Sequence, residues 1–114
     1  MDKGELLIGL LALAIGVLLL LGLHDIPHEI TIGSSGFDPN VTGIYPGKVI
    51  WINNDSQIHR VVSDDGLFDS GNLSPGENYT YDFSYHKIRI YEYHDPTNTS
   101  LKGTIQIEMG PGSY

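Results

Sequence analysis

The chain has 114 residues, and its 14 acidic side chains outnumber 6 basic ones to give a formal net charge of −8. This length accommodates one domain, and the acidic balance excludes nucleic acid as a partner because nucleic-acid binding needs clustered cations. The absence of cysteine excludes disulfides, thiolate nucleophiles and thiolate metal sites.

The first predicted element is a membrane helix. Residues 6–23 are a run of eighteen residues without a charged or strongly polar side chain. As a helix this run would span about 27 Å, which is enough for the hydrocarbon core of a bilayer. The residues after it lack the small-x-small pattern that a signal peptidase needs, and Pro27 favours the end of the helix. We therefore predict an uncleaved single-pass anchor over residues 1–27, with the C-terminal domain outside the cytoplasm.

A second hypothesis for the N-terminus comes from Lys3-Gly4-Glu5-Leu6, which resembles the cleavage context of archaeal pilin-type leaders. Cleavage after Gly4 would leave a chain that starts at Glu5. The apolar helix would then form the core of a surface filament.

Alternation of apolar and polar residues begins after Pro27 and is typical of half-buried strands. Turn sequences such as Pro46-Gly47 and Asp65-Gly66 separate the alternating segments. The pattern predicts an all-β, antiparallel sandwich or barrel over residues 28–109, followed by a flexible tail over residues 110–114. The clearest predicted strands are residues 29–32, 49–53, 79–83, 88–93 and 104–109.

Three groups of residues, taken in order, resemble the plastocyanin-type cupredoxins. The resemblance extends over roughly residues 30–109, which is nearly the whole segment after the helix. The resemblance implies a cupredoxin-like Greek-key β-sandwich. The groups are Phe37-Asp38-Pro39 with Pro46-Gly47, Val49 to Asp55 and His59; Phe68 to Gly71 with Leu73 to Glu77; and Tyr91 to Tyr93 with Leu101 to Ile105.

The resemblance also implies where copper would be bound. The family uses an upstream His, then a Cys, a second His and usually a Met. These positions fall on His59, Asp95, Asn98 and Leu101, so the type 1 copper ligands are largely replaced. Because blue copper needs a thiolate, we expect no electron transfer of the usual kind, no enzymatic activity and no cofactor.

Two interpretations of His59 remain open. His59, Asp95 and the neighbouring His94 offer two imidazoles and a carboxylate, a plausible donor set for a single copper ion or for zinc. Alternatively, His59 is a packing and hydrogen-bonding residue, and Asp95 binds the backbone of its own loop, as Asp-Pro turns do.

Five of the six asparagines begin an Asn-x-Ser/Thr triplet without proline in the middle, far more than composition alone gives. We predict a densely N-glycosylated surface. A sugar on Asn98, the second-His position, would stand over the mouth of the former copper pocket. The predicted sites are Asn40, Asn54, Asn72, Asn78 and Asn98.

These features favour a non-enzymatic structural or accessory subunit of a membrane or cell-surface assembly. Its partners would be the membrane and the other proteins of that assembly. Two alternatives are a copper-binding or copper-delivery module with a His/Asp site, and a pilin-like filament subunit.

Overall fold

The computed structural model describes residues 26–108 of the chain. The predicted membrane helix at residues 6–23, the possible cleavage site after Gly4 and the predicted tail at residues 110–114 lie outside these residues. Among residues 26–108, no helix is long and apolar enough to cross a membrane.

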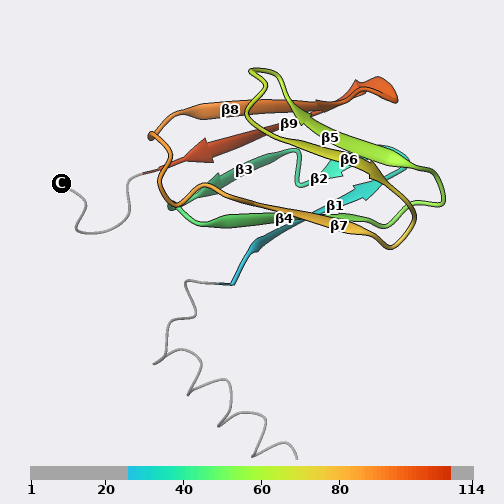
Figure 1. Ribbon diagram of the computed structural model, residues 1–114, viewed down its shortest axis with the longest axis horizontal. Coiled ribbons are helices and arrows are strands. Elements are labelled where there is room, and N and C mark those ends of the chain that lie inside the picture. Colours follow the sequence, from blue (N-terminus) through green and yellow to red (C-terminus); the bar gives the residue numbers. More distant parts are fainter. Residues whose placement is uncertain (1–25, 109–114) are drawn as a thin grey trace, which may run out of the picture.

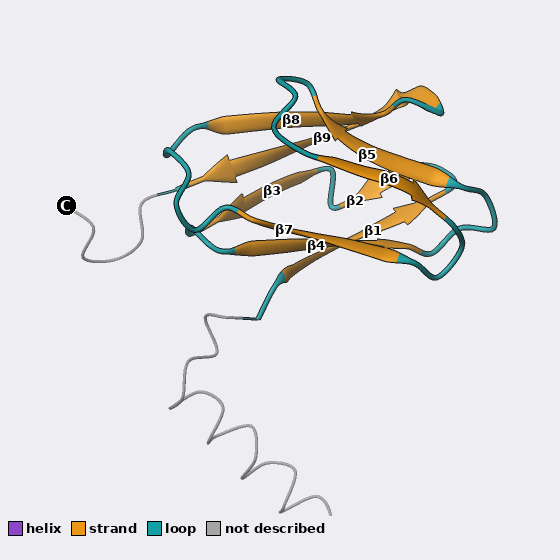
Figure 2. Ribbon diagram, viewed as in Figure 1, coloured by secondary structure: helices purple, strands orange, loops and turns teal. Residues whose placement is uncertain are grey.

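The described residues form strands and loops only (Figure 2). This confirms the all-β prediction, and it adds short strands that alternation alone did not reveal. The strands are β1 (His28–Gly33), β2 (Gly36–Asp38), β3 (Val41–Ile44), β4 (Lys48–Asn53), β5 (His59–Ser63), β6 (Asp69–Leu73), β7 (Asn78–Asp82), β8 (Ile90–Asp95) and β9 (Asn98–Ile107).

The strands build two facing sheets, in the orders β2-β1-β4-β7 and β3-β9-β8-β5-β6. Figure 1 shows β8, β9 and β5 above, and β1, β4 and β7 below. Two pairs, β1 with β4 and β3 with β9, are parallel, so the prediction of an antiparallel sandwich is wrong for them. The reason is the path of the chain. Between β1 and β4 it crosses to the other sheet as β3 and then returns, which lets β1 and β4 run in the same direction.

The core forms where the inward-facing residues of both sheets meet. In β4 and β8, every second residue is buried, and the residues between are half-buried or exposed, as expected when one face of each strand is covered. Trp51 of β4 packs edge-on against Tyr93 of β8, with 5.3 Å between ring centroids, and lies 5.4 Å from the ring of Phe68. These aromatic contacts join the two sheets.

Gly103 is the place where the core leaves no room for a side chain. It lies directly opposite Tyr93 in the β8–β9 pair. A Cβ at this position would lie 2.1 Å from Cζ of Tyr93, so the phenol ring crosses β9 where a larger residue would stand. Burial raises the pKa of Tyr93 to about 12, which keeps the phenol neutral.

The sandwich has two distinct ends. At its N-terminal end lie the start of β1, the β3–β4 loop, the β7–β8 loop and the end of β9. At its hairpin end lie the β1–β2, β4–β5 and β6–β7 turns and the β8–β9 hairpin. In Figure 1 the N-terminal end is on the left and the hairpin end on the right.

Candidate functional site

The β8–β9 hairpin holds the residue at the predicted cysteine position. Asp95 is the last residue of β8 and pairs with Asn98, the first residue of β9, so only Pro96 and Thr97 form the turn. Asp95 is fully buried. Its Oδ1 accepts hydrogen bonds from the backbone N–H of Thr97 (2.8 Å) and from its hydroxyl (2.6 Å). The Asp-Pro turn therefore fixes Asp95, as the hydrogen-bonding interpretation predicts.

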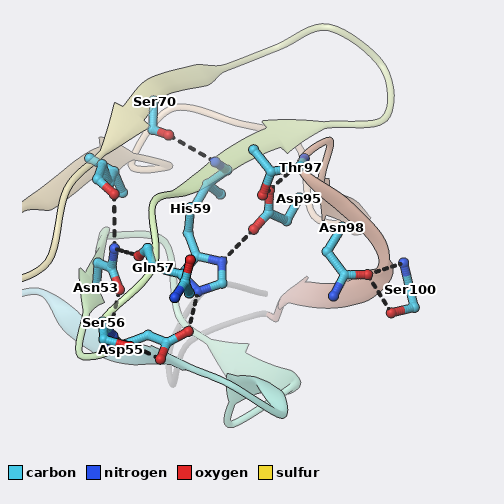
Figure 3. A network of polar contacts seen from close by, with 12 residues as sticks. Asn53, Asp55, Ser56, Gln57, His59, Ser70, Asp95, Thr97, Asn98 and Ser100 are labelled. Atoms are coloured by element: carbon cyan, nitrogen blue, oxygen red, sulfur yellow. Dashed lines mark hydrogen bonds and ion pairs between the residues drawn. The ribbon is translucent and has the colours of Figure 1, made fainter.

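His59 lies between two carboxylates (Figure 3). It is the first residue of β5 and is 5% exposed. Its Nδ1 lies 2.6 Å from Oδ2 of Asp95, and its Nε2 lies 2.7 Å from Oδ2 of Asp55. Asp95 belongs to the same sheet, whereas Asp55 is in the loop that leaves β4 of the other sheet. His59 therefore links the two sheets at the hairpin end.

The charges in this group follow from the hydrogen bonds. An ionised carboxylate only accepts hydrogen bonds, so an imidazole that faces a carboxylate oxygen with each ring nitrogen is best matched when both nitrogens carry a proton. Burial lowers the pKa of His59, but the hydrogen bonds and negative charges of Asp55 and Asp95 outweigh burial and raise it overall. The pKa of Asp55 is lowered by the hydrogen bond from His59 and by the backbone N–H of Ser56. The two carboxylates therefore favour the protonated form of His59.

Asn53 holds the loop that carries Asp55. It is the last residue of β4 and is fully buried. Its Nδ2 donates to the carbonyl oxygens of Gln57 and Leu73, each at 2.8 Å. Its Oδ1 accepts from the backbone N–H of Asp55 at 2.9 Å. One amide therefore fixes the β4–β5 loop, ties it to β6 and sets the position of Asp55 beside the imidazole.

Of the three predicted metal ligands, the structure brings two together. His59 and Asp95 are in contact, but His94 points to the opposite face of β8, where its Nδ1 bonds Oδ1 of the exposed Asp64 at 2.7 Å. Asp95 is the inward neighbour and His94 the outward one, as alternation along a strand requires. Among residues 26–108, no three His, Cys, Asp or Glu side chains form a group that could hold a metal ion.

A surface depression of about 540 Å³ lies over this group. Asn98 stands at it with an exposed side chain, and its Oδ1 accepts a hydrogen bond from the hydroxyl of Ser100 at 2.7 Å. Leu101, at the predicted methionine position, is buried. The lining includes Ser34, Asp55, Gln57, His59, Thr97 and Asn98.

Sequence reasoning did not identify Asp55 or Thr97 as members of this group. The available signal was local. Asp55 follows two asparagines at the end of a strand and precedes His59 by four residues, a spacing that a tight loop can close. Nothing in the sequence showed that Asn53 would bind that loop together.

The chain is similar to known proteins in structure but matches none in sequence families or among curated proteins. No family model matches the chain, and no curated protein matches it. Among solved structures, it is similar to a novel purple cupredoxin from Nitrosopumilus maritimus, with a TM-score of 0.64, 22% identity, and coverage of 71% of this chain and 99% of the other. It is also similar to a mutant of amicyanin in the Cu(I) state, with a TM-score of 0.64, 17% identity, and coverage of 72% and 82%.

A third similar structure is the Cu-containing nitrite reductase from Thermus scotoductus SA-01, with a TM-score of 0.66 and 23% identity. The match covers 75% of this chain but only 23% of the reductase. These likenesses show the fold: residues 26–108 form a cupredoxin-like domain, as the sequence resemblance predicted.

The residues present do not fit a type 1 copper ion. A free nitrogen lone pair is needed for an imidazole to bind a metal, and both nitrogens of His59 face carboxylates. Oxygen replaces sulfur at Asp95, and neither the Asn98 amide nor the Leu101 side chain supplies the missing soft ligand. The cupredoxin-like frame therefore holds an imidazole between two carboxylates, next to the positions to which the sequence resemblance assigned the copper ligands.

Proposed function

We propose that the chain is a membrane-anchored, N-glycosylated, extracytoplasmic cupredoxin-like module that serves as a non-enzymatic structural or accessory subunit of a membrane or cell-surface assembly. The observation that carries the proposal is the double hydrogen bonding of His59. A histidine held between two carboxylates joins the β4–β5 loop to the β8–β9 hairpin. In that role it stabilises the domain and leaves no ring nitrogen for a redox metal.

The exposure of the asparagines supports the glycosylation part of the proposal. All five sequon asparagines are exposed, whereas the sixth asparagine, Asn53, is fully buried and begins no sequon. Asn54, Asn78 and Asn98 lie at the hairpin end of the sandwich, and Asn72 lies beside Arg60 near that end. Sugars there would cover the surface through which a copper protein with this fold would be expected to exchange electrons.

The position at which β1 begins supports the anchoring part. The described chain begins at Ile26, next to the start of β1, at the end opposite the hairpin. An anchor formed by residues 6–23 would therefore hold the sandwich by its N-terminal end and direct the sequons at the hairpin end away from the membrane. This arrangement suits a module that covers the outer face of an assembly.

Metal analysis of the full chain, purified without added metal and then titrated with Cu(II), tests the function. We expect no stoichiometric copper and no rise in the melting temperature, because a ligand that binds only the folded state would raise it. His94→Ala is the matched control, since this histidine is only half-buried and lies outside the group. Stoichiometric copper that persists in His94→Ala and disappears in His59→Ala would refute the structural role.

The alternative function is copper binding or delivery through a His/Asp site. One observation favours it: His59 and Asp95, the two family positions that still offer donors, remain in contact at 2.6 Å. Copper at this site would have to displace a proton from His59. The titration would then show binding that strengthens as the pH rises, whereas the structural role predicts none at any pH at which the domain stays folded.

Glycopeptide mass spectrometry of the chain from its native source tests the sugars. We expect occupied sequons at the hairpin end, including Asn98. A native protein in which all five asparagines are bare would remove glycosylation from the proposal and leave the role of His59 untouched.

A further inference from the structure

The N-terminal end of the sandwich carries most of the exposed large apolar side chains of the described residues. Tyr85, in the β7–β8 loop, is 98% exposed. Among residues 26–108, five of the seven exposed large hydrophobic residues lie at this end, and only Val41, on the edge strand β3, and Ile58, at the hairpin end, lie elsewhere. The five are Ile26, Tyr45, Tyr85, Ile88 and Ile90.

Backbone contacts hold these residues at one end. The N–H of Phe83 donates to the carbonyl of Gly47 at 2.7 Å, which joins the β7–β8 loop to the β3–β4 loop. The N–H of Ile107 donates to the carbonyl of Arg89 at 3.0 Å, and β1 begins beside the start of β4. Both loops therefore lie at the same end of the sandwich as the start of β1 (Figure 1).

We propose that this end of the sandwich rests on the lipid bilayer, with Tyr45, Tyr85 and Ile88 in the headgroup region. The inference rests on the proposed anchoring by residues 6–23. Only residues 24–27 separate that run from β1, and four extended residues reach at most about 14 Å. The headgroup layer on each side of a bilayer is about 5–8 Å thick. Residues 24–27 are thus too few to let the N-terminal end lie far from the membrane surface.

The chemistry of the exposed side chains fits that location. Tyrosine combines an apolar ring with a polar hydroxyl and is enriched where hydrocarbon meets water. Isoleucine at 52–55% exposure, as at Ile26, Ile88 and Ile90, loses unfavourable contact with water on entering the layer.

The charges at this end indicate which lipid headgroup the contact with the bilayer requires. Lys48, Lys87 and Arg89 lie there. The aliphatic parts of such long side chains can pack against the headgroup region while the charged groups stay in water. Asp82 and Glu108 lie there too, and Arg89 is already paired with Asp65. Because the charges are mixed, the contact does not depend on anionic lipid. Zwitterionic phosphatidylcholine is therefore the probe of choice.

The test uses the absence of cysteine, which allows one label per chain. The full-length variants Tyr85→Cys and Ile58→Cys are labelled with an environment-sensitive fluorophore and placed in phosphatidylcholine discs with one chain per disc. Position 58 is the matched control because Ile58 is 51% exposed but lies at the hairpin end. Emission, quenching by aqueous iodide and quenching by nitroxide on the lipid headgroup are measured at both positions.

We expect a label at position 85 to emit at shorter wavelength, to be several-fold less accessible to iodide and to be quenched by the headgroup nitroxide. The label at position 58 should behave as in water. Equal, water-like behaviour at both positions in chains that co-elute with discs overturns the docking and leaves the anchoring intact. Chains that do not co-elute overturn both. Shielding at position 85 that requires two chains per disc identifies a second copy, not lipid, as the occupant and also overturns the proposal.

Discussion

The two ends of the sandwich depart from the usual distribution of side chains in opposite ways. The hairpin end buries charge: His59 and Asp95 are almost inaccessible and bond each other. The N-terminal end exposes apolar groups, with Tyr85 the most exposed. A buried charge is tolerated only when it is paired, and an exposed apolar cluster indicates contact with something else. The difference indicates that the hairpin end serves the domain's own stability, while the N-terminal end serves an interaction.

The largest expected effect comes from removing the imidazole. His59→Ala leaves the fully buried Asp95 without its positive partner and detaches Asp55 from β5. Breaking a buried pair by removing one member costs about 3–5 kcal/mol, so we expect the free energy of unfolding to fall by about that amount. Urea unfolding of the full chain in detergent, followed by the fluorescence of the single, fully buried Trp51, measures it.

The matched control for this prediction is His94→Ala. His94 also pairs with an aspartate, at 2.7 Å, but both side chains are substantially exposed. Exposed ion pairs contribute about 0–1 kcal/mol. Equal losses in the two variants would show that the buried group at the hairpin end has no special role.

A somewhat smaller loss in the free energy of unfolding is expected from a substitution at Gly103, which pairs with Tyr93 in the β8–β9 pair. Gly103→Ala places a Cβ 2.1 Å from Cζ of Tyr93, and the ring cannot move freely because it packs against Trp51 and Phe37. Overpacking a core typically costs about 1–3 kcal/mol. The same urea experiment measures the loss. Gly66→Ala is not a suitable control, because the positive φ of Gly66 would itself strain an alanine there.

Gly33→Ala provides the comparison for Gly103→Ala. Gly33 ends β1, its φ is not positive, and a Cβ there meets nothing within 4 Å. We expect it to leave the urea midpoint nearly unchanged. A stable Gly103→Ala variant would mean that the Tyr93 ring lies elsewhere in the folded protein.

The pH dependence of stability probes the charges at the hairpin end directly. The folded-state pKa of His59 is raised above its unfolded value of about 6.5. Its contribution is therefore fully present below about pH 6.5 and is lost as the pH rises through the folded pKa. The pKa of Asp55 is lowered below about 3.9, so its contribution is present above that pH and is lost as the pH falls through the folded pKa.

We accordingly expect the domain to be most stable between about pH 4 and pH 6.5. Urea midpoints measured from pH 3 to pH 9 test this window. His59→Gln should lose the decline on the alkaline side. The acid side is shared with Asp69, whose pKa Arg60 lowers to about 2. An unchanged alkaline decline in His59→Gln would assign it to another group.

Much of the fold was predictable because its signals are local. Alternation identified the strands around Trp51 and Tyr93, and the order of turns and strands carried the resemblance to cupredoxins. Local patterns did not reveal the parallel pairing of β1 with β4. That pairing depends on where the chain crosses between sheets, and the crossing strand β3 has only four residues.

The candidate site was predictable in part. The resemblance placed His59 beside Asp95. The sequence hypothesis also counted His94 as a ligand, whereas the structure turns it to the other face of β8, where it bonds Asp64. Asp55 was missed because its position depends on the side chain of Asn53, which binds carbonyl groups four and twenty residues away. Such a contact is fixed only when the sheets pack. The likeness to copper proteins concerns the fold, while the hydrogen bonding of His59 is determined by Asp55 and Asp95.

The smallest expected effect concerns the N-terminal end and separates an interaction surface from a structural one. Tyr85→Ser together with Ile88→Ser removes apolar area from side chains that are already largely exposed, so the urea midpoint in detergent should stay unchanged. In phosphatidylcholine discs the same variant should increase the iodide accessibility of a label placed at position 45. A lower midpoint in detergent would show that the loop residues support the fold. With the midpoint unchanged and the accessibility raised, the exposed side chains hold the domain on lipid while the buried histidine holds it together.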